Sequence, residues 1–265
     1  MKTHVEFLGL PGAGKTTLAR ELCRYARSLG CKAFEAEEAL YVALRRRSRW
    51  YDLRRPLAYC SYARGKRWLH AVYARPRFSC EALDRFLDDH GGLVRTLGAI
   101  LRRPEQFQDS VLLVTWLVRL FSGYELAAEM LKQDEALVLD EGFCSRALSM
   151  FGYCAGAADP DKVRAYIAAV PAPDAVICVD APAQSRAARL AARGRLPARL
   201  KNADAARRAQ LERNFEACLA AAAHELAVRG IAVLHVKNDG PLEDCCRELN
   251  ARAAELFTAS GARIP

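Results

Sequence analysis

Hydrophobic residues along the chain form five short runs, separated by longer segments with helical spacing. The runs are Val5–Leu8, Lys32–Phe34, Ala136–Leu139, Ala175–Val179 and Ile231–Val236. The Lys32 run is the weakest, whereas the last three are nearly continuous and bounded by Asp, Pro or Gly, which is typical of strands buried on both faces. Because strands that alternate with helices need crossover connections, the pattern predicts an α/β fold with a five-stranded parallel sheet and helices on both faces.

Two long segments near the end of the chain have apolar residues on one helical face. The face in 203–229 carries Leu211, Phe215, Cys218, Leu219, Ala222 and Leu226, and the face in 241–258 carries Leu242, Cys245, Cys246, Leu249, Ala253 and Phe257. Pro241 stands where a first helical residue is expected. The spacing predicts two amphipathic helices that cover the sheet.

The stretch from about 38 to 133 breaks this alternation, because it has helical spacing and no convincing strand. We therefore expect a single domain over 1–265, with a core at 1–37 and 134–265 and a helical insertion between them. The insertion also holds most of the excess positive charge. The chain has 40 Lys and Arg against 31 Asp and Glu, and 45–77 alone contains eleven basic residues and one acid.

A charge concentrated in one segment indicates an anionic ligand, although a solvated basic helix face would look the same. The residues expected to favour an anionic acceptor are Arg45, Arg46, Arg47, Arg54 and Arg55, and those expected to stack a ring, or else to pack in the core, are Trp50, Tyr51, Trp68 and Tyr73.

The ten cysteines contain no CxxC pair, and the five histidines show no metal-ligand spacing. Together with the lack of a secretory signal at the first residues, this predicts reduced thiols in a cytoplasmic protein. The longest apolar run, Val111–Val118, is far shorter than the about 20 residues of a membrane helix, so we expect no membrane partner.

Gly9–Thr16 reads GLPGAGKT and matches the phosphate-binding pattern GxxxxGK[ST], between a predicted strand and a helical segment. Glycines let the backbone N–H groups surround a phosphate, and the helix start adds positive potential. Lys15 would reach the β- and γ-phosphates of ATP, and the Thr16 hydroxyl would ligate Mg²⁺. The residues expected around the phosphates are Pro11, Gly12, Ala13, Gly14, Lys15, Thr16 and Thr17.

Asp140 follows the Ala136–Leu139 run, at the strand end where open α/β sheets bind ligands. It is the expected second Mg²⁺ ligand, with a simple helix cap as the alternative. Glu141 is a candidate base or a surface residue. Arg146 would point at substrate or into solvent.

Glu35, Glu37 and Glu38 cluster just beyond the second strand. Glu37 is the candidate general base among them, and a capping or solvated turn is the alternative. A third feature is the Arg-rich segment after Ala175–Val179, where Arg186, Arg189 and Arg193 precede a Gly–Pro turn. We expect a lid at about 189–203 that neutralises charge during phosphoryl transfer.

These motifs resemble the P-loop kinases of nucleosides and nucleoside monophosphates, nearest the thymidylate kinases. The resemblance rests on GLPGAGKTT, VLDEGF, PDAVICVDAPAQSRAARLAARGR and IAVLHVKNDG, which cover about half of the chain. It implies the three-layer P-loop NTPase fold and transfer of the ATP γ-phosphoryl group. It also implies that Arg189 lies against adenine, that Arg193 contacts phosphates, and that Asn238 to Gly240 approach the base.

The acceptor half departs from the family, because Glu141 and Gly142 follow Asp140 where thymidylate kinases usually have Arg. We therefore expect a kinase for a nucleoside, nucleotide or similar small acceptor, with the acceptor's identity open. Two alternatives stay open: a kinase of nucleic-acid ends or another macromolecule, and a P-loop ATPase or switch. A homodimer is one expectation for the oligomeric state.

Overall fold

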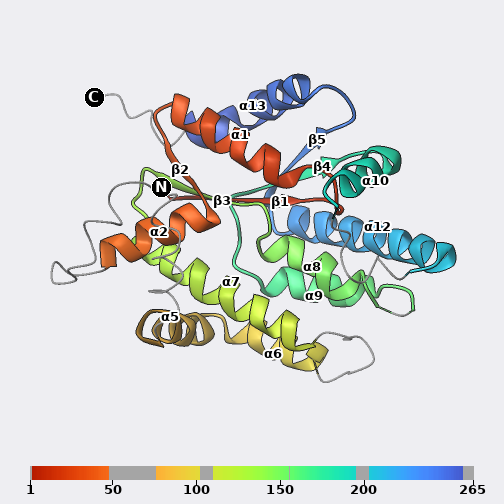
Figure 1. Ribbon diagram of the computed structural model, residues 1–265. Coiled ribbons are helices and arrows are strands. Elements are labelled where there is room, and N and C mark those ends of the chain that lie inside the picture. Colours follow the sequence, from red (N-terminus) through yellow and green to blue (C-terminus); the bar gives the residue numbers. More distant parts are fainter. Residues whose placement is uncertain (1, 48–75, 102–109, 155, 195–202, 259–265) are drawn as a thin grey trace.

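A computed structural model describes residues 2–47, 76–101, 110–154, 156–194 and 203–258 of the chain, and every structural statement concerns these residues. Five strands form one all-parallel sheet. They are β1 (Thr3–Leu8), β2 (Lys32–Glu35), β3 (Glu135–Leu139), β4 (Ala175–Asp180) and β5 (Ala232–Lys237). Their order is β2-β3-β1-β4-β5, so β1 is central and its carboxyl end leads into the glycine-rich loop (Figure 1). All five predicted runs are strands, including the weak second one.

The prediction that the last strand is buried on both faces is wrong. β5 is an edge strand, in which Ala232, His235 and Lys237 are exposed and Val236 is buried. Ile231 precedes the strand, and its N–H bonds to Leu226 O of the preceding helix turn. An apolar run at a sheet edge has the same composition as a central strand, so the sequence pattern does not separate the two.

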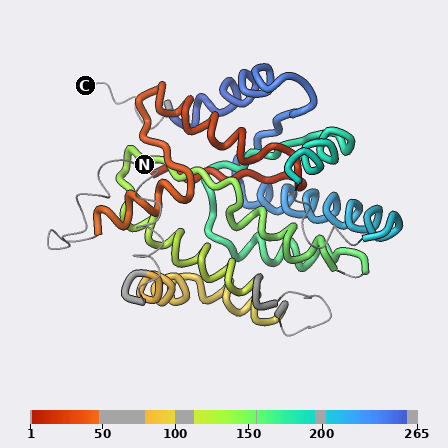
Figure 2. Tube along the Cα trace, in the orientation of Figure 1, coloured from red at the N-terminus to blue at the C-terminus, as the bar shows by residue number. Residues whose placement is uncertain are grey.

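Two helices cover one face of the sheet: α1 (Lys15–Ser28) and α13 (Leu242–Thr258), which run side by side (Figure 2). Val5, Phe7 and Ile177 of the sheet pack against Leu18 of α1 and Leu249 of α13. The predicted buried face of the last helix is therefore confirmed, except that Leu242 at its start is exposed. The helix begins at Leu242, one residue later than expected, and Pro241 precedes it.

The opposite face is covered by α8 (Phe143–Phe151), α9 (Pro160–Ala169) and α12 (Ala205–Val228), together with α2 (Ala36–Arg47) and α7 (Ser110–Met130). Two further helices, α5 (Pro76–Asp89) and α6 (Gly91–Leu101), lie outside α7, while α10 (Ala183–Ala192) follows β4 (Figure 1). The three-layer α/β fold of the P-loop type is confirmed. The described part of the insertion is helical, as predicted.

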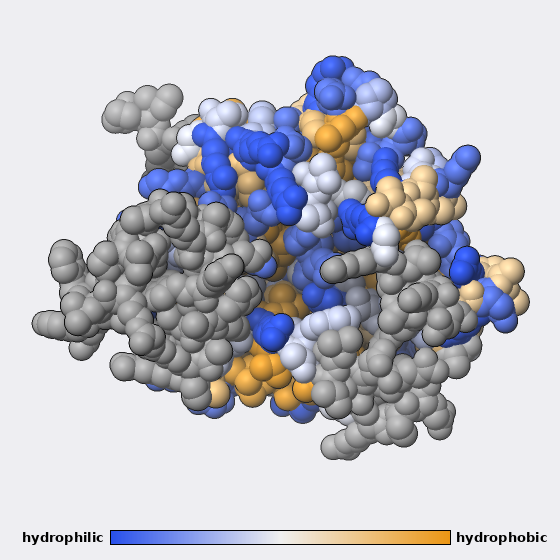
Figure 3. Space-filling view, in the orientation of Figure 1, coloured by the Kyte–Doolittle hydropathy of each residue, from blue (hydrophilic) through white to orange (hydrophobic). Residues whose placement is uncertain are grey.

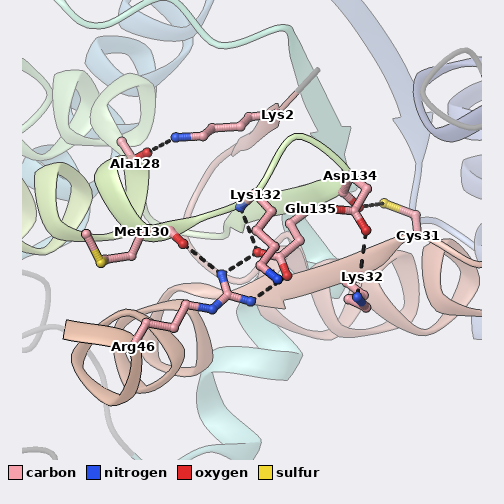
Figure 4. A network of polar contacts seen from close by, with 9 residues as sticks. All are labelled: Lys2, Cys31, Lys32, Arg46, Ala128, Met130, Lys132, Asp134 and Glu135. Atoms are coloured by element: carbon pink, nitrogen blue, oxygen red, sulfur yellow. Dashed lines mark hydrogen bonds and ion pairs between the residues drawn. The ribbon is translucent and has the colours of Figure 1, made fainter. Parts of the chain in front are cut away.

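The amino edge of the sheet holds an ion pair between a buried carboxylate and Arg46, which fixes α2. Glu135, the first residue of β3, is 1% exposed and accepts hydrogen bonds from Arg46 Nη1 and Nη2 at 2.5 and 2.6 Å. Arg46 also donates to Met130 O at 2.7 Å, and the Lys132 N–H donates to Glu135 (Figure 4). Burial opposes the charged form, yet these hydrogen bonds hold the pKa of Glu135 below its ordinary value.

This placement corrects the expectation that Arg46 and Arg47 face an anionic acceptor. α2 starts beside the carboxyl end of β2 and ends beside the amino end of β3, so its last turn lies away from Asp140. Arg47 pairs with Glu81 and Glu129 at 2.7 and 2.9 Å. Arg45 is an exposed residue of the same last turn. The remaining expected residues lie outside the described ranges: Arg54, Arg55, Trp50, Tyr51, Trp68 and Tyr73.

The face drawn in Figure 3 is hydrophilic over α1 and has a hydrophobic area low in the view, in the region of α6 and α7. Among the described side chains of α7, Val114, Trp116 and Val118 are exposed large hydrophobic residues. No helix in the described part of the chain has both the length and the apolar character needed to cross a bilayer.

Candidate functional site

The glycine-rich loop between β1 and α1 turns sharply at two glycines. Gly12 and Gly14 have φ values of +82° and +100°, which side chains other than glycine adopt only with strain. Between them the Ala13 N–H bonds to Leu10 O at 3.1 Å. A Cβ at Gly12 would lie 2.7 Å from the carbonyl oxygen of Arg186 in α10, so the loop and α10 touch through backbone atoms. The loop has the shape that its sequence predicts, at the amino end of a 14-residue helix.

Lys15 is the first residue of α1, and its ammonium group bends back over the loop. Nζ donates to Gly9 O at 2.8 Å and to Leu10 O at 3.4 Å. Burial lowers the pKa of Lys15, the Arg193 guanidinium acts in the same direction, and Glu141 and Asp140 oppose both. The ammonium group is therefore surrounded by charged side chains from two distant parts of the chain, the connection after β3 and the end of α10.

Thr16 and Asp140 meet although 124 positions separate them, because β1 and β3 are neighbours and both end at the same edge. The Thr16 hydroxyl donates to Asp140 Oδ2 at 2.7 Å. Both oxygens are hard donors of the kind that Mg²⁺ prefers, so the pair fits a Mg²⁺ site. Within the described ranges no three His, Cys, Asp or Glu side chains converge, so phosphate or water oxygens would complete this pair's coordination.

Glu141 and Arg146 form the next charged pair beside Asp140. Arg146 Nη2 donates to Glu141 Oε2 at 3.2 Å, with Glu141 62% exposed and Arg146 15% exposed. The guanidinium carbon of Arg146 lies 5.2 Å from the ring centre of Trp116 in α7. Arg146 is thus held between an acid and an aromatic ring, and sequence reasoning did not assign Trp116 to the site.

A polar cavity of about 530 Å³ opens at the Thr16–Asp140 contact, and both residues line its wall. Glu37, in the first turn of α2, lines the same cavity. The other two acids of the predicted cluster line the cavity as well, where Glu35, the last residue of β2, lies 3.4 Å from Arg20, and Glu38 pairs with Arg27. The structure therefore brings all three acids to the carboxyl edge together with Asp140.

On the other side of the loop, Arg189 and Asn238 hold the carbonyl group of Ala13. Asn238 Nδ2 donates to Ala13 O at 2.6 Å and Arg189 Nη1 donates to it at 3.3 Å, while Arg189 Nη2 donates to Asn238 Oδ1 at 3.1 Å. Asn238 is 5% exposed. These two residues, predicted from separate motifs, belong to one cluster against the phosphate loop.

Two further predicted residues, Arg193 and Gly240, are exposed. Arg193 stands at the end of α10, and Gly240 follows β5 in an exposed turn. Arg186 has a structural position, because it donates to Ala181 O and pairs with Glu212 of α12. The predicted lid from 195 to 202 lies outside the described residues.

Sequence reasoning also missed Glu6, a buried acid in β1. Its carboxylate accepts the N–H groups of Phe143 and Cys144 at 3.0 and 2.7 Å. The available signal was a charged residue inside an apolar central strand, which needs partners to be buried.

No family model matches the chain, and no curated protein does. Among solved structures the chain is similar to the crystal structure of TT1252 from Thermus thermophilus, with 19% sequence identity, 98% of each chain covered and a TM-score of 0.35. A likeness at this TM-score carries no argument. The fold is therefore assigned from the sheet topology of this chain, and a function is argued from the geometry of the site.

Proposed function

We propose that the protein is an ATP-dependent phosphotransferase that moves the γ-phosphoryl group to a small acceptor, such as a nucleoside or nucleotide. One observation carries the proposal: the hydroxyl of Thr16 meets the carboxylate of Asp140 at 2.7 Å, at the end of a complete phosphate loop. A glycine-rich turn without function has no reason to place a hydroxyl and a carboxylate at its helix start.

Each residue has a role that its position supports. The loop N–H groups and Lys15 hold the β- and γ-phosphates, and Thr16 and Asp140 hold Mg²⁺. When bound, Mg²⁺ neutralises the charge of the phosphate oxygens. Arg189 and Asn238 brace the loop on the side where the base of ATP would lie. Arg193 adds positive charge near Lys15.

The transfer forms one bond and breaks one. The acceptor oxygen attacks the γ-phosphorus, the bond from the γ-phosphorus to the β–γ bridging oxygen breaks, and ADP leaves with its electron pair. When the acceptor is a hydroxyl group, its proton passes to a carboxylate. The candidates at this edge are Asp140 and Glu141, which follow β3, and Glu37 in the first turn of α2.

The acceptor would lie over Glu141, Arg146 and Trp116. A guanidinium group above an aromatic ring suits a molecule with a planar ring and a negative charge. This arrangement supports a nucleoside or nucleotide over an uncharged aliphatic acceptor.

The test compares Lys15→Ala with Lys32→Ala, an exposed lysine at the amino end of β2. We expect Lys15→Ala to abolish acceptor-dependent ADP release while its circular dichroism spectrum stays that of wild type, and Lys32→Ala to keep full turnover. Wild-type turnover in Lys15→Ala would contradict the proposal.

A P-loop ATPase or switch is the second candidate, and the exposed Glu141 beside Asp140 favours it, because an acid at this place can activate water. Acceptor-independent ADP release at the full rate would support hydrolysis.

The third candidate, a nucleic-acid or macromolecule kinase, rests on the basic segment 45–77, most of which lies outside the described residues. It predicts oligonucleotide binding that weakens steeply with salt.

A further inference from the structure

Glu6 lies in the middle of the central strand and has no exposed surface. Its side chain faces α8, on the same side of the sheet as His4 and Leu8, since alternate strand residues share a face. A buried carboxylate is stable only where hydrogen-bond donors or cations surround it. The partners of Glu6 therefore indicate why a charge sits in this apolar strand.

These partners are the first two N–H groups of α8. Oε1 accepts from Phe143 N at 3.0 Å and Oε2 accepts from Cys144 N at 2.7 Å. The helix has no cap of its own, because its N-cap residue is Gly142 and its first turn contains no acid. Glu6 thus supplies from β1 the capping acceptor and the negative charge that a helix start favours.

Gly142 leaves room for the Glu6 carboxylate because it has no side chain, and its backbone torsion does not require glycine. Its φ of −83° is open to any residue. A Cβ there would lie 2.6 and 2.7 Å from the two carboxylate oxygens of Glu6, which leaves no room for a side chain. The absence of a side chain at Gly142 thus lets Glu6 approach the helix start.

The contact joins the two halves of the candidate site. Glu6 comes three residues before Gly9, where the phosphate loop starts, and Gly142 comes two residues after Asp140. We propose that Glu6 is a positioning residue that fixes the start of α8 and thereby holds Glu141 and Arg146 beside the Thr16–Asp140 pair. Its effect on turnover rests on the proposed function, whereas the anchoring of α8 does not.

A histidine and two tyrosines also lie near the Glu6 carboxylate. His4 Nε2 lies 3.2 Å from Oε1. Burial, helped by the charge of Glu6, raises the pKa of Tyr124 to about 12 and that of Tyr166 well above its usual range. Both phenols therefore stay neutral, and Tyr166 donates to Phe143 O at 3.1 Å.

The first test is Glu6→Gln, measured by amide hydrogen exchange and by steady-state kinetics. Glutamine has one acceptor oxygen and presents an NH₂ group to the second helix N–H. We expect exchange at the Phe143 and Cys144 amides to rise at least about tenfold, with exchange in 12–16 unchanged. The kcat should fall about tenfold or more, while the KM for ATP stays within about threefold, because the phosphate loop is intact.

A second variant approaches the same contact from the helix. Gly142→Ala should push the carboxylate away and give the same split between kcat and KM, so it carries the test if Glu6→Gln does not fold. The matched control is Tyr166→Phe, which removes another buried hydrogen bond to Phe143. In Tyr166→Phe the carbonyl oxygen of Phe143 still accepts its hydrogen bond within α8. Amide exchange in α8 and the kcat should therefore stay within about twofold of wild type.

The outcomes separate the two proposals. Unchanged exchange at Phe143 and Cys144 in Glu6→Gln would overturn the anchoring, whether or not ATP binds. Faster exchange with unchanged kcat, or equal losses in kcat and affinity that follow the melting temperature, would overturn the positioning role. If the wild-type protein fails to bind an ATP analogue, the proposed function fails, and the exchange data still decide the anchoring.

Discussion

At the scale of single residues, the site depends on backbone conformations that few side chains tolerate. Gly12 and Gly14 hold left-handed torsions on either side of Ala13, whose carbonyl group Asn238 and Arg189 bind. A side chain at Gly14 would collide with the amide nitrogen of Asn238. The glycines of the motif therefore serve both the torsion and the close packing of the loop.

We predict that Gly14→Ala lowers the free energy of unfolding by about 1–3 kcal/mol and weakens binding of an ATP analogue at least about tenfold. The control is Gly30→Ala, where φ is +86° and no atom lies within 4 Å of the added methyl group. The control should lose stability through torsion alone, by about 1–2 kcal/mol, and bind normally. Urea unfolding and calorimetry measure both quantities. Equal binding by the two variants would show that the loop tolerates the collision.

At the scale of elements, the last turn of α2 is fixed at the amino edge of the sheet, away from the site. Glu135 keeps a lowered pKa through its hydrogen bonds with Arg46 and Lys132, against the effect of burial. A carboxylate with a lowered pKa stabilises the fold above its unfolded pKa, near 4.5, and this stability is lost as pH falls through the folded pKa.

Glu135→Gln should therefore cost about 1.5–3 kcal/mol at pH 7, because Arg46 loses its charged partner. The deficit should shrink as pH falls below about 4, where the wild-type carboxyl also binds a proton. Chemical unfolding of both proteins between pH 3 and pH 7 measures this. A deficit that stays constant over the whole range would show that the charge of Glu135 plays no part.

Some features of the fold and the site can be predicted from the sequence, and others cannot, because only some of them depend on local sequence. The positions of Lys15 and Thr16 at the loop depend on local sequence alone. The position of Asp140 beside them can be predicted because parallel strands end at the same edge of the sheet. The pairing of Arg46 with Glu135 depends on the length of α2, which carries its basic end to the amino edge. The edge position of β5 and the contact of Trp116 with Arg146 depend on how distant elements pack. No periodicity along the chain encodes that packing.

At the scale of the whole molecule, the core holds thiols that stay protonated. Burial raises the pKa of Cys23, Cys178 and Cys218 to about 12 in each case. The unfolded chain releases these protons near pH 8.5, so the folded state binds them more tightly. The protonated thiols therefore contribute their full stabilisation below about pH 8.5, the pKa in the unfolded chain. This stabilisation is lost as the pH rises from there through the pKa of the folded state.

We therefore predict that the free energy of unfolding falls between pH 8 and pH 11, and that Cys178→Ala falls less over the same range. At pH 8 a thiol reagent should label the exposed Cys80 quickly and the three buried thiols only after the fold opens. Peptide mass spectrometry locates the labels. Rapid labelling of Cys178 in the folded protein would contradict this picture of the core.

The central claim is that Thr16 and Asp140 share one Mg²⁺ ion on a nucleotide. Calorimetric titration of a non-hydrolysable ATP analogue, with and without Mg²⁺, tests it in the wild-type protein and in Asp140→Asn. We predict that Mg²⁺ tightens binding to the wild-type protein by at least about tenfold and that Asp140→Asn loses most of this gain, with its Mg²⁺-free affinity little changed. The same Mg²⁺ gain in both proteins would contradict the account.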